Sequence, residues 1–207
     1  MTDEKKLLIE EIVNKYKSCP YPAPRVTRRG KPHTTVDFSG ISRDDVRARD
    51  EFYMSCAAEL AALAADFGEV PVGAVMVMGD RILAADFNGR ETEKNALYHA
   101  ELAVIGESCR VLGGWRLPGC ELFVTLEPCI MCAGGIISAR VPRVVFGASD
   151  KKAGAMGGVF DSTQLPLNHR AAVTSGVLAE RCEALLTEFF EKKRNAVNNE
   201  ININGKE

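Results

Sequence analysis

The chain has 207 residues, of which 46% are hydrophobic, and it carries a formal net charge of -2 with an isoelectric point near 6.0. This length and composition suit one ordinary folded domain with appendages. The lack of a basic charge excess excludes a protein that coats nucleic acid through its overall field. No apolar run approaches the ~20 residues that span a bilayer, and residues 1–11 lack the apolar core of a secretion signal. We therefore expect a cytoplasmic protein without a membrane segment.

The first 40 residues differ in composition from the rest of the chain. Residues 3–17 place apolar side chains at helical spacing, which predicts a short amphipathic helix. The stretch that follows contains four prolines, which favours a linker or a wrapped arm over a helix or a central strand. It also holds a basic cluster, Arg25, Arg28, Arg29 and Lys31. This cluster fits either an arm that touches RNA or a solvated linker, and the linker is the simpler interpretation.

Residues 41–194 are predicted to form one domain of alternating helices and strands. In chain order we predict a helix over 41–68, two strands paired around Gly79-Asp80, a helix over 99–114, a strand over 121–126, a helix from Pro128, a strand over 143–148, a strand within 170–178 and a helix over 178–194. This alternation predicts an α/β layered domain with an antiparallel first pair and later strands paired in parallel. The asparagine-rich residues 195–207 are predicted to be a disordered tail.

Cys129 and Cys132 stand at C-x-x-C spacing directly after a predicted strand. This spacing is typical of redox pairs, disulfides and metal sites, and it does not decide among them. Seven cysteines form an odd number, and without a leader sequence they are expected to be reduced. The others in the domain are interpreted as small buried residues: Cys56, Cys109, Cys120 and Cys182.

His99 and Glu101 favour a metal over a redox pair, because a thiol-disulfide exchange site would leave both unexplained. Helical spacing places the sulfurs of Cys129 and Cys132 on one face within one turn, and the helix N-terminus favours thiolates. His99 is predicted to begin another helix. Two thiolates and one imidazole suit Zn2+ and leave the fourth tetrahedral position for water, which indicates catalysis. Glu101 would then act as acid and base.

The motif H-A-E at residues 99–101 and the motif P-C-I-M-C at residues 128–132 resemble the signature of the zinc nucleoside and nucleobase deaminases. Over about residues 50–194 the chain is similar to the tRNA-specific adenosine deaminases of that superfamily. The similar segments include E-V-P-V-G-A-V, T-L-E-P-C-I-M-C, L-N-H-R and the paired phenylalanines that basic residues follow. The free-nucleoside cytidine deaminases usually show P-C-G-x-C instead.

This resemblance implies a three-layer α/β/α cytidine-deaminase-like fold with a five-stranded mixed sheet, assembled as a homodimer with one Zn2+ per subunit. It implies zinc-dependent hydrolytic deamination of adenosine to inosine at the wobble position of the tRNA anticodon. By the same resemblance His99, Cys129 and Cys132 bind zinc, and Glu101 carries the proton. The residues implied in substrate binding are Asn88 and the Ala100 backbone at the base, and Asp150, Lys152, Asn168, Phe190, Lys193 and Arg194 at the anticodon loop.

Several departures from the family pattern lie beside the expected pocket. The family usually has D-P-T-A before or overlapping His99, and here Leu97 and Tyr98 take the place of its proline and threonine. The segment A-D-F-N replaces the usual tryptophan before Asn88. Ser149 stands where arginine is common, and residues 1–40 have no counterpart that we recognise. Two alternatives remain open: a deaminase of a free base or nucleotide of the guanine or cytosine type, and a non-catalytic RNA-binding subunit that keeps zinc for structure. An intact Glu101 weighs against the second.

Overall fold

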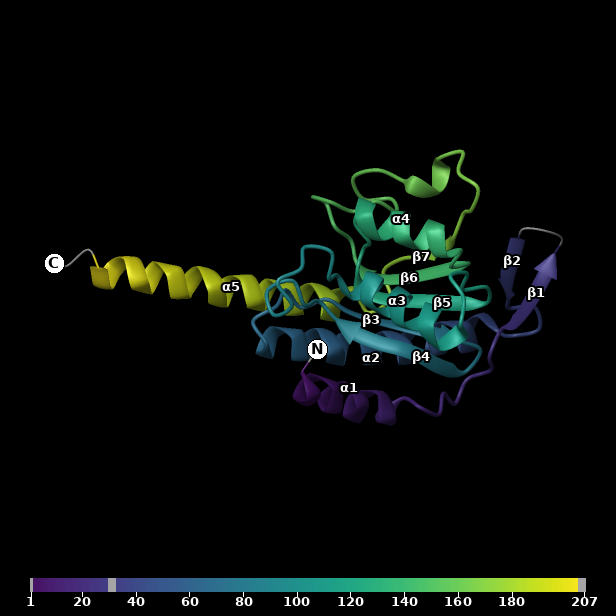
Figure 1. The fold of residues 1–207 in the computed structure, drawn as a ribbon, viewed down its shortest axis with the longest axis horizontal. Helices are drawn as coiled ribbons and strands as arrows, with labels where there is room; N and C mark the ends of the chain where they lie inside the picture. Colours follow the sequence, from purple (N-terminus) through teal and green to yellow (C-terminus); the bar gives the residue numbers. More distant parts are fainter. Residues whose placement is uncertain (1, 30–32, 205–207) are drawn as a thin grey trace.

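Helices and strands alternate through most of the chain, as the sequence predicts (Figure 1). The structure is a computed structural model, and it describes residues 2–29 and 33–204. The helices are α1 (Asp3–Lys15), α2 (Arg43–Asp66), α3 (Ala100–Leu112), α4 (Ile130–Ala139), α5 (Ala179–Asn204) and the 3-10 turn η1 (Ser162–Gln164). The strands are β1 (Arg25–Arg29), β2 (His33–Asp37), β3 (Gly73–Met78), β4 (Arg81–Phe87), β5 (Cys120–Leu126), β6 (Arg143–Ala148) and β7 (Ala172–Thr174).

The main sheet is mixed, which confirms the predicted fold class. Within the described residues it has five strands in the order β4-β3-β5-β6-β7. β3 is antiparallel to both β4 and β5, whereas β5 pairs with β6, and β6 with β7, in parallel. Because the parallel strands β5 and β6 point the same way, the segments that follow Leu126 and Ala148 leave the sheet at one edge.

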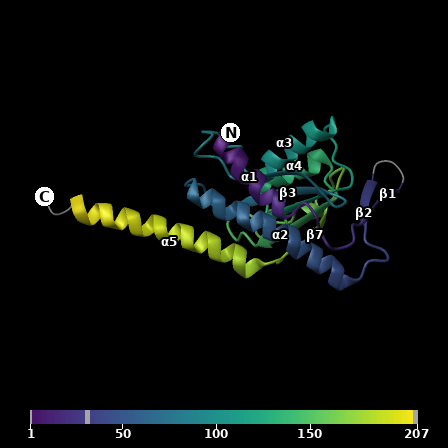
Figure 2. The ribbon, with the colours of Figure 1, turned by 90° about the horizontal axis from the view of Figure 1, so that it is seen from below.

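Side chains along the strands alternate between two hydrophobic cores. Met76 and Leu122 face α3 and α4, whereas Val75 and Phe123 face α1, α2 and α5. The described chain therefore forms the three layers α/β/α, with the sheet in the middle (Figures 1 and 2).

The helix α2 begins and ends close to the predicted residues. The hydroxyl of Ser42 accepts a hydrogen bond from the backbone N–H of Asp45 at 3.0 Å, so Ser42 caps the helix as expected. The chain turns at Gly68, whose φ is +76°. Gly73 allows the helix to approach β3 closely, because a Cβ there would collide with the carbonyl oxygen of Ala57.

The predicted N-terminal helix is confirmed as α1, and it packs on α2 and on the edge strand β4. Ile9 is buried in the core shared with α2. At the end of α1, Lys15 Nζ and Tyr16 Oη lie 2.7 Å and 2.6 Å from the two carboxylate oxygens of Glu59 on α2. The helix is thus part of the folded body.

The basic segment expected to be a linker or a wrapped arm contains an antiparallel pair of strands, β1 and β2, which runs from Arg25 opposite Asp37 to Arg29 opposite His33. Its valines and threonines favour extended backbone, which explains the difference from the expectation. Arg28 and Arg29 lie on β1, whereas Lys31 of the basic cluster lies outside the described residues.

The last helix, α5, continues to Asn204 and extends beyond the rest of the molecule (Figures 1 and 2). The prediction of a disordered tail from residue 195 is therefore wrong for residues 195–204, while residues 205–207 lie outside the described residues. A helix that is already nucleated on the core adds a residue without a second nucleation cost, which explains the extension. No helix in the described part of the chain has the length and apolar character needed to cross a membrane.

A buried ionic network, which no sequence pattern indicated, joins α2 to the sheet. The carboxylate of Glu121 lies 2.7 Å from Arg49 and 2.8 Å from Arg143, and Arg143 also lies 2.6 Å from Asp50. Glu121 and Arg49 are fully buried. Each charge therefore depends on its partners, because an unpaired charge in this position would be strongly destabilising.

Candidate metal centre

His99 lies where a loop meets a helix. It is the N-cap of α3, with extended backbone at φ -87° and ψ 148°, so the predicted helix start is confirmed. The loop before it, residues 89–98, is closed by a hydrogen bond from Gly89 N–H to the carbonyl oxygen of Tyr98 at 3.1 Å. A short closed loop therefore sets the position of the imidazole.

Cys129 precedes its helix instead of lying inside it. The prediction that the helix opens at Pro128 is wrong, because α4 begins one residue after Cys129, which is the N-cap at φ -71° and ψ 174°. Cys129 forms an isolated antiparallel bridge with Gly154, and Ala155 N–H donates to the carbonyl oxygen of Pro128 at 2.9 Å. These contacts hold the segment extended. Cys132 lies in the first turn of α4, close to Cys129.

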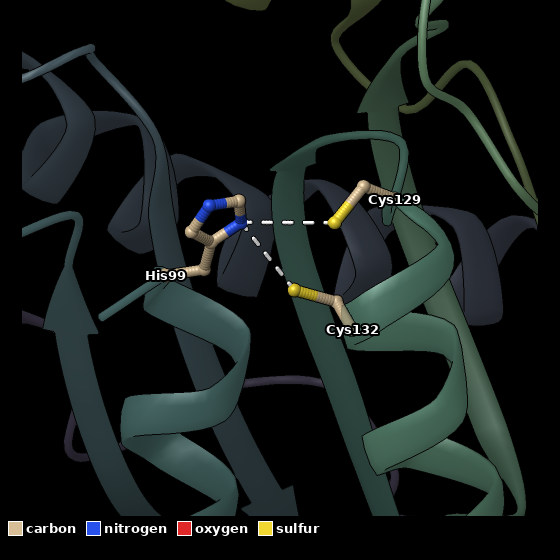
Figure 3. A group of neighbouring side chains, drawn as sticks. All are labelled: His99, Cys129 and Cys132. Carbon is tan, nitrogen blue, oxygen red and sulfur yellow. Dashed lines mark hydrogen bonds between the residues drawn. The ribbon is translucent and has the colours of Figure 1, made fainter. Parts of the chain in front are cut away.

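The imidazole of His99 faces both sulfurs (Figure 3). Its Nδ1 lies 3.8 Å from Cys129 Sγ and 3.5 Å from Cys132 Sγ, and the three donor atoms lie within 4.8 Å of one another. Zinc distances of about 2.3 Å to sulfur and about 2.0 Å to nitrogen place tetrahedral donors roughly 3.5–3.8 Å apart. The three residues therefore fit a Zn2+ ion. None of the seven cysteines, all of which lie in the described ranges, forms a disulfide.

The two thiols hold their protons unequally. The pKa of Cys129 is lowered to about 3, because the thiol of Cys132 and the ring of His99 hydrogen-bond its thiolate. The same bond to Cys129, together with burial, raises the pKa of Cys132. The pKa of His99 is raised, chiefly by its hydrogen bond to Cys129. One sulfur is thus anionic without a metal, and a bound divalent cation favours loss of the second proton.

Glu101 lies in the first turn of α3, within hydrogen-bonding reach of the Cys132 thiol. It is 4% exposed, and among the described residues its Oε2 has no hydrogen-bond partner. Burial raises the pKa of this carboxyl group. Buried polar atoms are nearly always paired, so an unpaired carboxylate oxygen beside three metal donors indicates a group that binds or reacts with a ligand.

Asn88 and Ala100, both predicted to contact the base, contact each other. Asn88 follows β4, and its Oδ1 accepts a hydrogen bond from Ala100 N–H at 3.0 Å. Both residues are buried. The contact ties the start of the loop that follows β4 to the first residue of α3, so a base that binds Ala100 N–H must displace the Asn88 oxygen.

The loop after β6 carries two of the residues predicted to touch the anticodon loop. Asp150 Oδ1 accepts hydrogen bonds from the backbone N–H groups of Lys152 and Ala153 at 2.8 Å and 3.1 Å. Lys152 is exposed. Because Gly154 of this loop bridges to Cys129, the structure brings the loop next to the metal donors. Asn168 lies in a different segment, before β7, and is exposed.

The other predicted RNA contacts lie on α5. Phe190 is 43% exposed, whereas Phe189 is 8% exposed, and their rings meet edge to face at 5.4 Å. Phe189 therefore belongs to the core, whereas the ring of Phe190 is accessible to a ligand. Lys193 and Arg194 are exposed, and Lys193 Nζ lies 5.0 Å from the centre of the Phe189 ring.

Glu127 is a further buried residue of the site, and it is not among the residues predicted from the sequence. Its Oε1 accepts hydrogen bonds from the N–H groups of Met156 and Gly158 at 2.9 Å and 2.8 Å, and its Oε2 accepts one from Asp150 N–H at 3.1 Å. A Cβ at Gly154 or Gly158 would collide with this carboxylate. Glu127 therefore shapes the loop that holds Cys129. An acidic residue at the end of an apolar strand, with a glycine-rich segment downstream, was the available signal.

Comparison with known sequences agrees with the geometry. The cytidine and deoxycytidylate deaminase zinc-binding region matches residues 47–148. The chain is 49% identical over 147 residues to the tRNA-specific adenosine deaminase of Bacillus subtilis (strain 168), covering 70% of this chain and 91% of that protein. It is 43% identical over 148 residues to the tRNA-specific adenosine deaminase of Aquifex aeolicus (strain VF5), covering 71% and 97%.

Solved structures give the same picture. A chain from work on A-to-I editing by tRNA:A34 deaminases at the wobble position of transfer RNA matches with a TM-score of 0.62 and 41% identity, covering 65% of this chain and 98% of that one. The guanine deaminase of Nitrosomonas europaea matches with a TM-score of 0.58 and 27% identity, covering 67% and 83%. Because the sequence identity extends over nearly the whole length of its relatives, the chain belongs to the tRNA-specific adenosine deaminase family of the cytidine and deoxycytidylate deaminases.

Proposed function

We propose that the protein catalyses the zinc-dependent hydrolytic deamination of adenosine to inosine in tRNA, at the wobble position of the anticodon. The observation that carries this proposal is the set of three metal donors, His99, Cys129 and Cys132, beside the unpaired carboxylate oxygen of Glu101. The relatives named tRNA-specific adenosine deaminases support the substrate.

His99 Nδ1, Cys129 Sγ and Cys132 Sγ would hold the metal. When bound, zinc supplies a Lewis acid that lowers the pKa of a water molecule to about 7. The loop closed by Gly89 and Tyr98 orients the imidazole, and the bridge to Gly154 orients Cys129. The protein thus presents donors in a fixed arrangement before the substrate binds.

Glu101 moves the protons in this proposal. Its carboxylate takes a proton from the water molecule that adds to C6 of adenine and passes it to N1. Glu101 then takes the hydroxyl proton and delivers it to the amine at C6, which leaves as ammonia. The C6 carbon keeps the oxygen, so adenosine and water become inosine and ammonia.

Asn88 and Ala100 orient the base. A purine that is stacked in a helix cannot present C6 to the site, so the substrate base must be unpaired or turned out of its stack, and an anticodon loop offers such a base. The amide of Asn88 can hydrogen-bond the edge of the base, and the N–H of Ala100 can do so once the base displaces the Asn88 oxygen.

Contacts to the rest of the anticodon loop would come from two surfaces. The loop next to Cys129 offers Asp150 and Lys152, and the exposed face of α5 offers the ring of Phe190 for stacking. Cationic side chains on α5 would contact phosphates, which suits an acidic protein with a local basic surface. The residues proposed for these contacts are Asp150, Lys152, Asn168, Phe190, Lys193 and Arg194.

A second candidate function is the deamination of a free base, and the structural similarity to a guanine deaminase favours it. The two functions differ in what must be bound. A free-base deaminase needs no contact outside the pocket, whereas the proposed tRNA enzyme uses Phe190, Lys193 and Arg194. The presence of Glu101 weighs against a third possibility, an RNA-binding subunit without catalysis.

We also propose that the protein acts in the cytoplasm as a homodimer. Large apolar side chains are exposed at the start of α4 and in the segment between β6 and β7, which suits an interface between subunits. They are Ile130 at 60%, Val159 at 57%, Leu165 at 43% and Leu167 at 50% exposure. Light scattering of the purified protein tests the assembly, and a mass of one subunit at micromolar concentration would contradict it.

The test of the function is to incubate the zinc-loaded protein with total tRNA and to sequence the RNA for A-to-I changes. Free guanine, adenine and cytosine are assayed in parallel. We expect inosine at a wobble position and no change in the free bases. Glu101→Gln is the control, because it removes the proton carrier and keeps the size of the side chain, so it should bind zinc without editing. Deamination of guanine with unchanged tRNA would establish the second candidate instead.

A further inference from the structure

One buried lysine on α1 contacts residues at the two ends of the loop 89–98, which precedes His99. Lys5 is 2% exposed, and its Nζ lies 2.9 Å from Oδ1 of Asp86 near the end of β4. The same ammonium group lies 4.2 Å from the ring centre of Phe87 and 4.9 Å from that of Tyr98. A buried lysine is rare unless it is paired, so this arrangement is a specific contact of the folded chain.

Asp86 and Tyr98 connect Lys5 to the loop of residues 89–98. Tyr98 Oη donates a hydrogen bond to Asp86 Oδ2 at 3.0 Å, so the carboxylate binds Lys5 with one oxygen and Tyr98 with the other. The ring of Tyr98 rests on Gly89, where a Cβ would lie 2.8 Å from the Tyr98 ring. The tyrosine therefore closes the two ends of the loop against each other.

The loop ends directly at the residues that the proposed chemistry needs. Asn88 precedes Gly89, and His99 follows Tyr98. The N–H of His99 donates to the carbonyl oxygen of Leu97 at 2.8 Å, which closes a tight turn with Tyr98 at its centre. Because Tyr98 lies inside this turn, a shift of Tyr98 moves the backbone of His99. A displacement at the Lys5 contact is thus transmitted to a metal donor and to a base-contacting side chain.

The helix α1 is anchored well enough to act on the loop. Thr2 Oγ1 accepts a hydrogen bond from Lys5 N–H at 3.3 Å and caps the first turn of α1, which holds the backbone of Lys5 in the helix. The far end of α1 is held to α2 through Tyr16 and Glu59. Ile9, between these ends, is buried in the core shared with α2, so Lys5 contacts the loop from a helix that is packed on the folded body.

We propose that Lys5 is a positioning residue of the deamination site, which orders the loop of residues 89–98, and with it Asn88 and His99, through Asp86 and Tyr98. The kinetic part of this inference rests on the proposed function.

The first test measures how well the loop of residues 89–98 is ordered, and it does not require catalytic activity. Amide hydrogen exchange is followed in the full-length, zinc-loaded protein for the wild type, Lys5→Met and the control Lys6→Met. Lys6 is the neighbouring lysine on α1, and its side chain is 52% exposed. We expect the amides of Gly89, Tyr98 and His99 to exchange roughly tenfold faster in Lys5→Met, as for a broken contact between coupled neighbours, and to be unchanged in Lys6→Met.

Two further variants test the route. Asp86→Asn weakens the same contact from the side of β4. It takes the place of Lys5→Met in the exchange experiment if Lys5→Met does not fold. If Lys5 acts through Asp86, the double variant should exchange no faster than Asp86→Asn alone, because Asp86 also binds Tyr98 directly. Additive effects of the two substitutions would overturn the route. Faster exchange in α1 with an unchanged loop would overturn the proposal, because Lys5 would then only anchor the helix.

The kinetic test separates positioning from stability. We expect kcat on tRNA to fall roughly tenfold in Lys5→Met at a temperature where the protein is folded, with little change in KM or zinc content. KM should remain close to the wild-type value, because the substitution does not change the RNA contacts proposed on α5. An unchanged kcat in a folded Lys5→Met with a loosened loop would contradict the positioning role. If the wild type does not edit tRNA, the proposed function fails, while the exchange result still decides whether Lys5 orders the loop.

Discussion

The side-chain oxygen of Asn88 accepts a hydrogen bond from the backbone N–H of Ala100 at 3.0 Å. This bond joins the end of β4 to the start of α3, one residue after the metal donor His99. The N–H belongs to the first turn of the helix and has no partner within the helix itself, so Asn88 satisfies a donor that would otherwise be unpaired.

Asn88→Ala should therefore lower kcat/KM on tRNA by roughly a hundredfold, because it removes both an orienting group and a predicted base contact. Zinc content should remain at the wild-type level. The measurement is steady-state kinetics with metal analysis of the same samples. Asn14→Ala, an exposed position on α1, serves as the control. Wild-type kinetics in Asn88→Ala would remove this residue from the proposed site.

Cys129→Ser should weaken zinc binding by more than roughly a hundredfold, since changes in residues that only support metal ligands already cost ten- to a hundredfold. The hydroxyl of serine stays protonated and is a poor zinc ligand. Competition with a chromogenic chelator measures the affinity. Cys109→Ser is the matched control, because Cys109 is a free thiol outside the donor cluster. Full zinc occupancy of Cys129→Ser under competition would remove this sulfur from the ligand set.

Glu127→Gln should loosen the loop of residues 150–158. The carboxylate accepts three backbone N–H groups, and an amide replaces one acceptor oxygen by a donor, which leaves at least one N–H without a partner. The free energy of unfolding should fall by about 1–3 kcal/mol. Urea denaturation measures this change, with the exposed Glu183→Gln on α5 as the control. A variant as stable as the control would show that the loop does not depend on this carboxylate.

The adjacent phenylalanines of α5 should respond in opposite ways. Phe190→Ala should weaken binding of an anticodon stem-loop by about 1–3 kcal/mol, the range for one stacked base, and leave the melting temperature nearly unchanged. Phe189→Ala should lower the free energy of unfolding by about 3 kcal/mol, because its ring is 8% exposed. Fluorescence anisotropy and thermal denaturation measure the two effects. Equal RNA affinity in Phe190→Ala and wild type would exclude the stacking role.

Glu121→Gln should destabilise the fold by about 3 kcal/mol, because the buried cations Arg49 and Arg143 lose their shared carboxylate. The matched control is Glu107→Gln on α3, which removes a carboxylate from an exposed pair with Arg110. Exposed pairs contribute little, so the control should unfold at nearly the wild-type urea concentration. Equal midpoints for the two variants would mean that the buried network does not hold α2 on the sheet.

The order of elements and the sheet could be predicted because their signals are local. The apolar, β-favouring runs of β3 and β5 and the capping Ser42 of α2 are signals that depend on a few neighbouring residues at a time. The candidate metal donors could also be predicted from the sequence, since the C-x-x-C and H-A-E motifs each lie within a single short segment. The position of the start of α4 was not, because the bridge from Cys129 to Gly154 overrides the helix preference of Pro128.

By itself the sequence determined the candidate donor atoms, the proposal of Glu101 as proton carrier and the alternation of helices and strands, because donor chemistry and periodicity are intrinsic to short segments. Only the tertiary structure decided that Lys5 meets Asp86 and that Glu127 binds the loop after β6. Such contacts join residues that are distant along the chain, and they exist only when the packing of the sheet and its helices brings buried polar groups together.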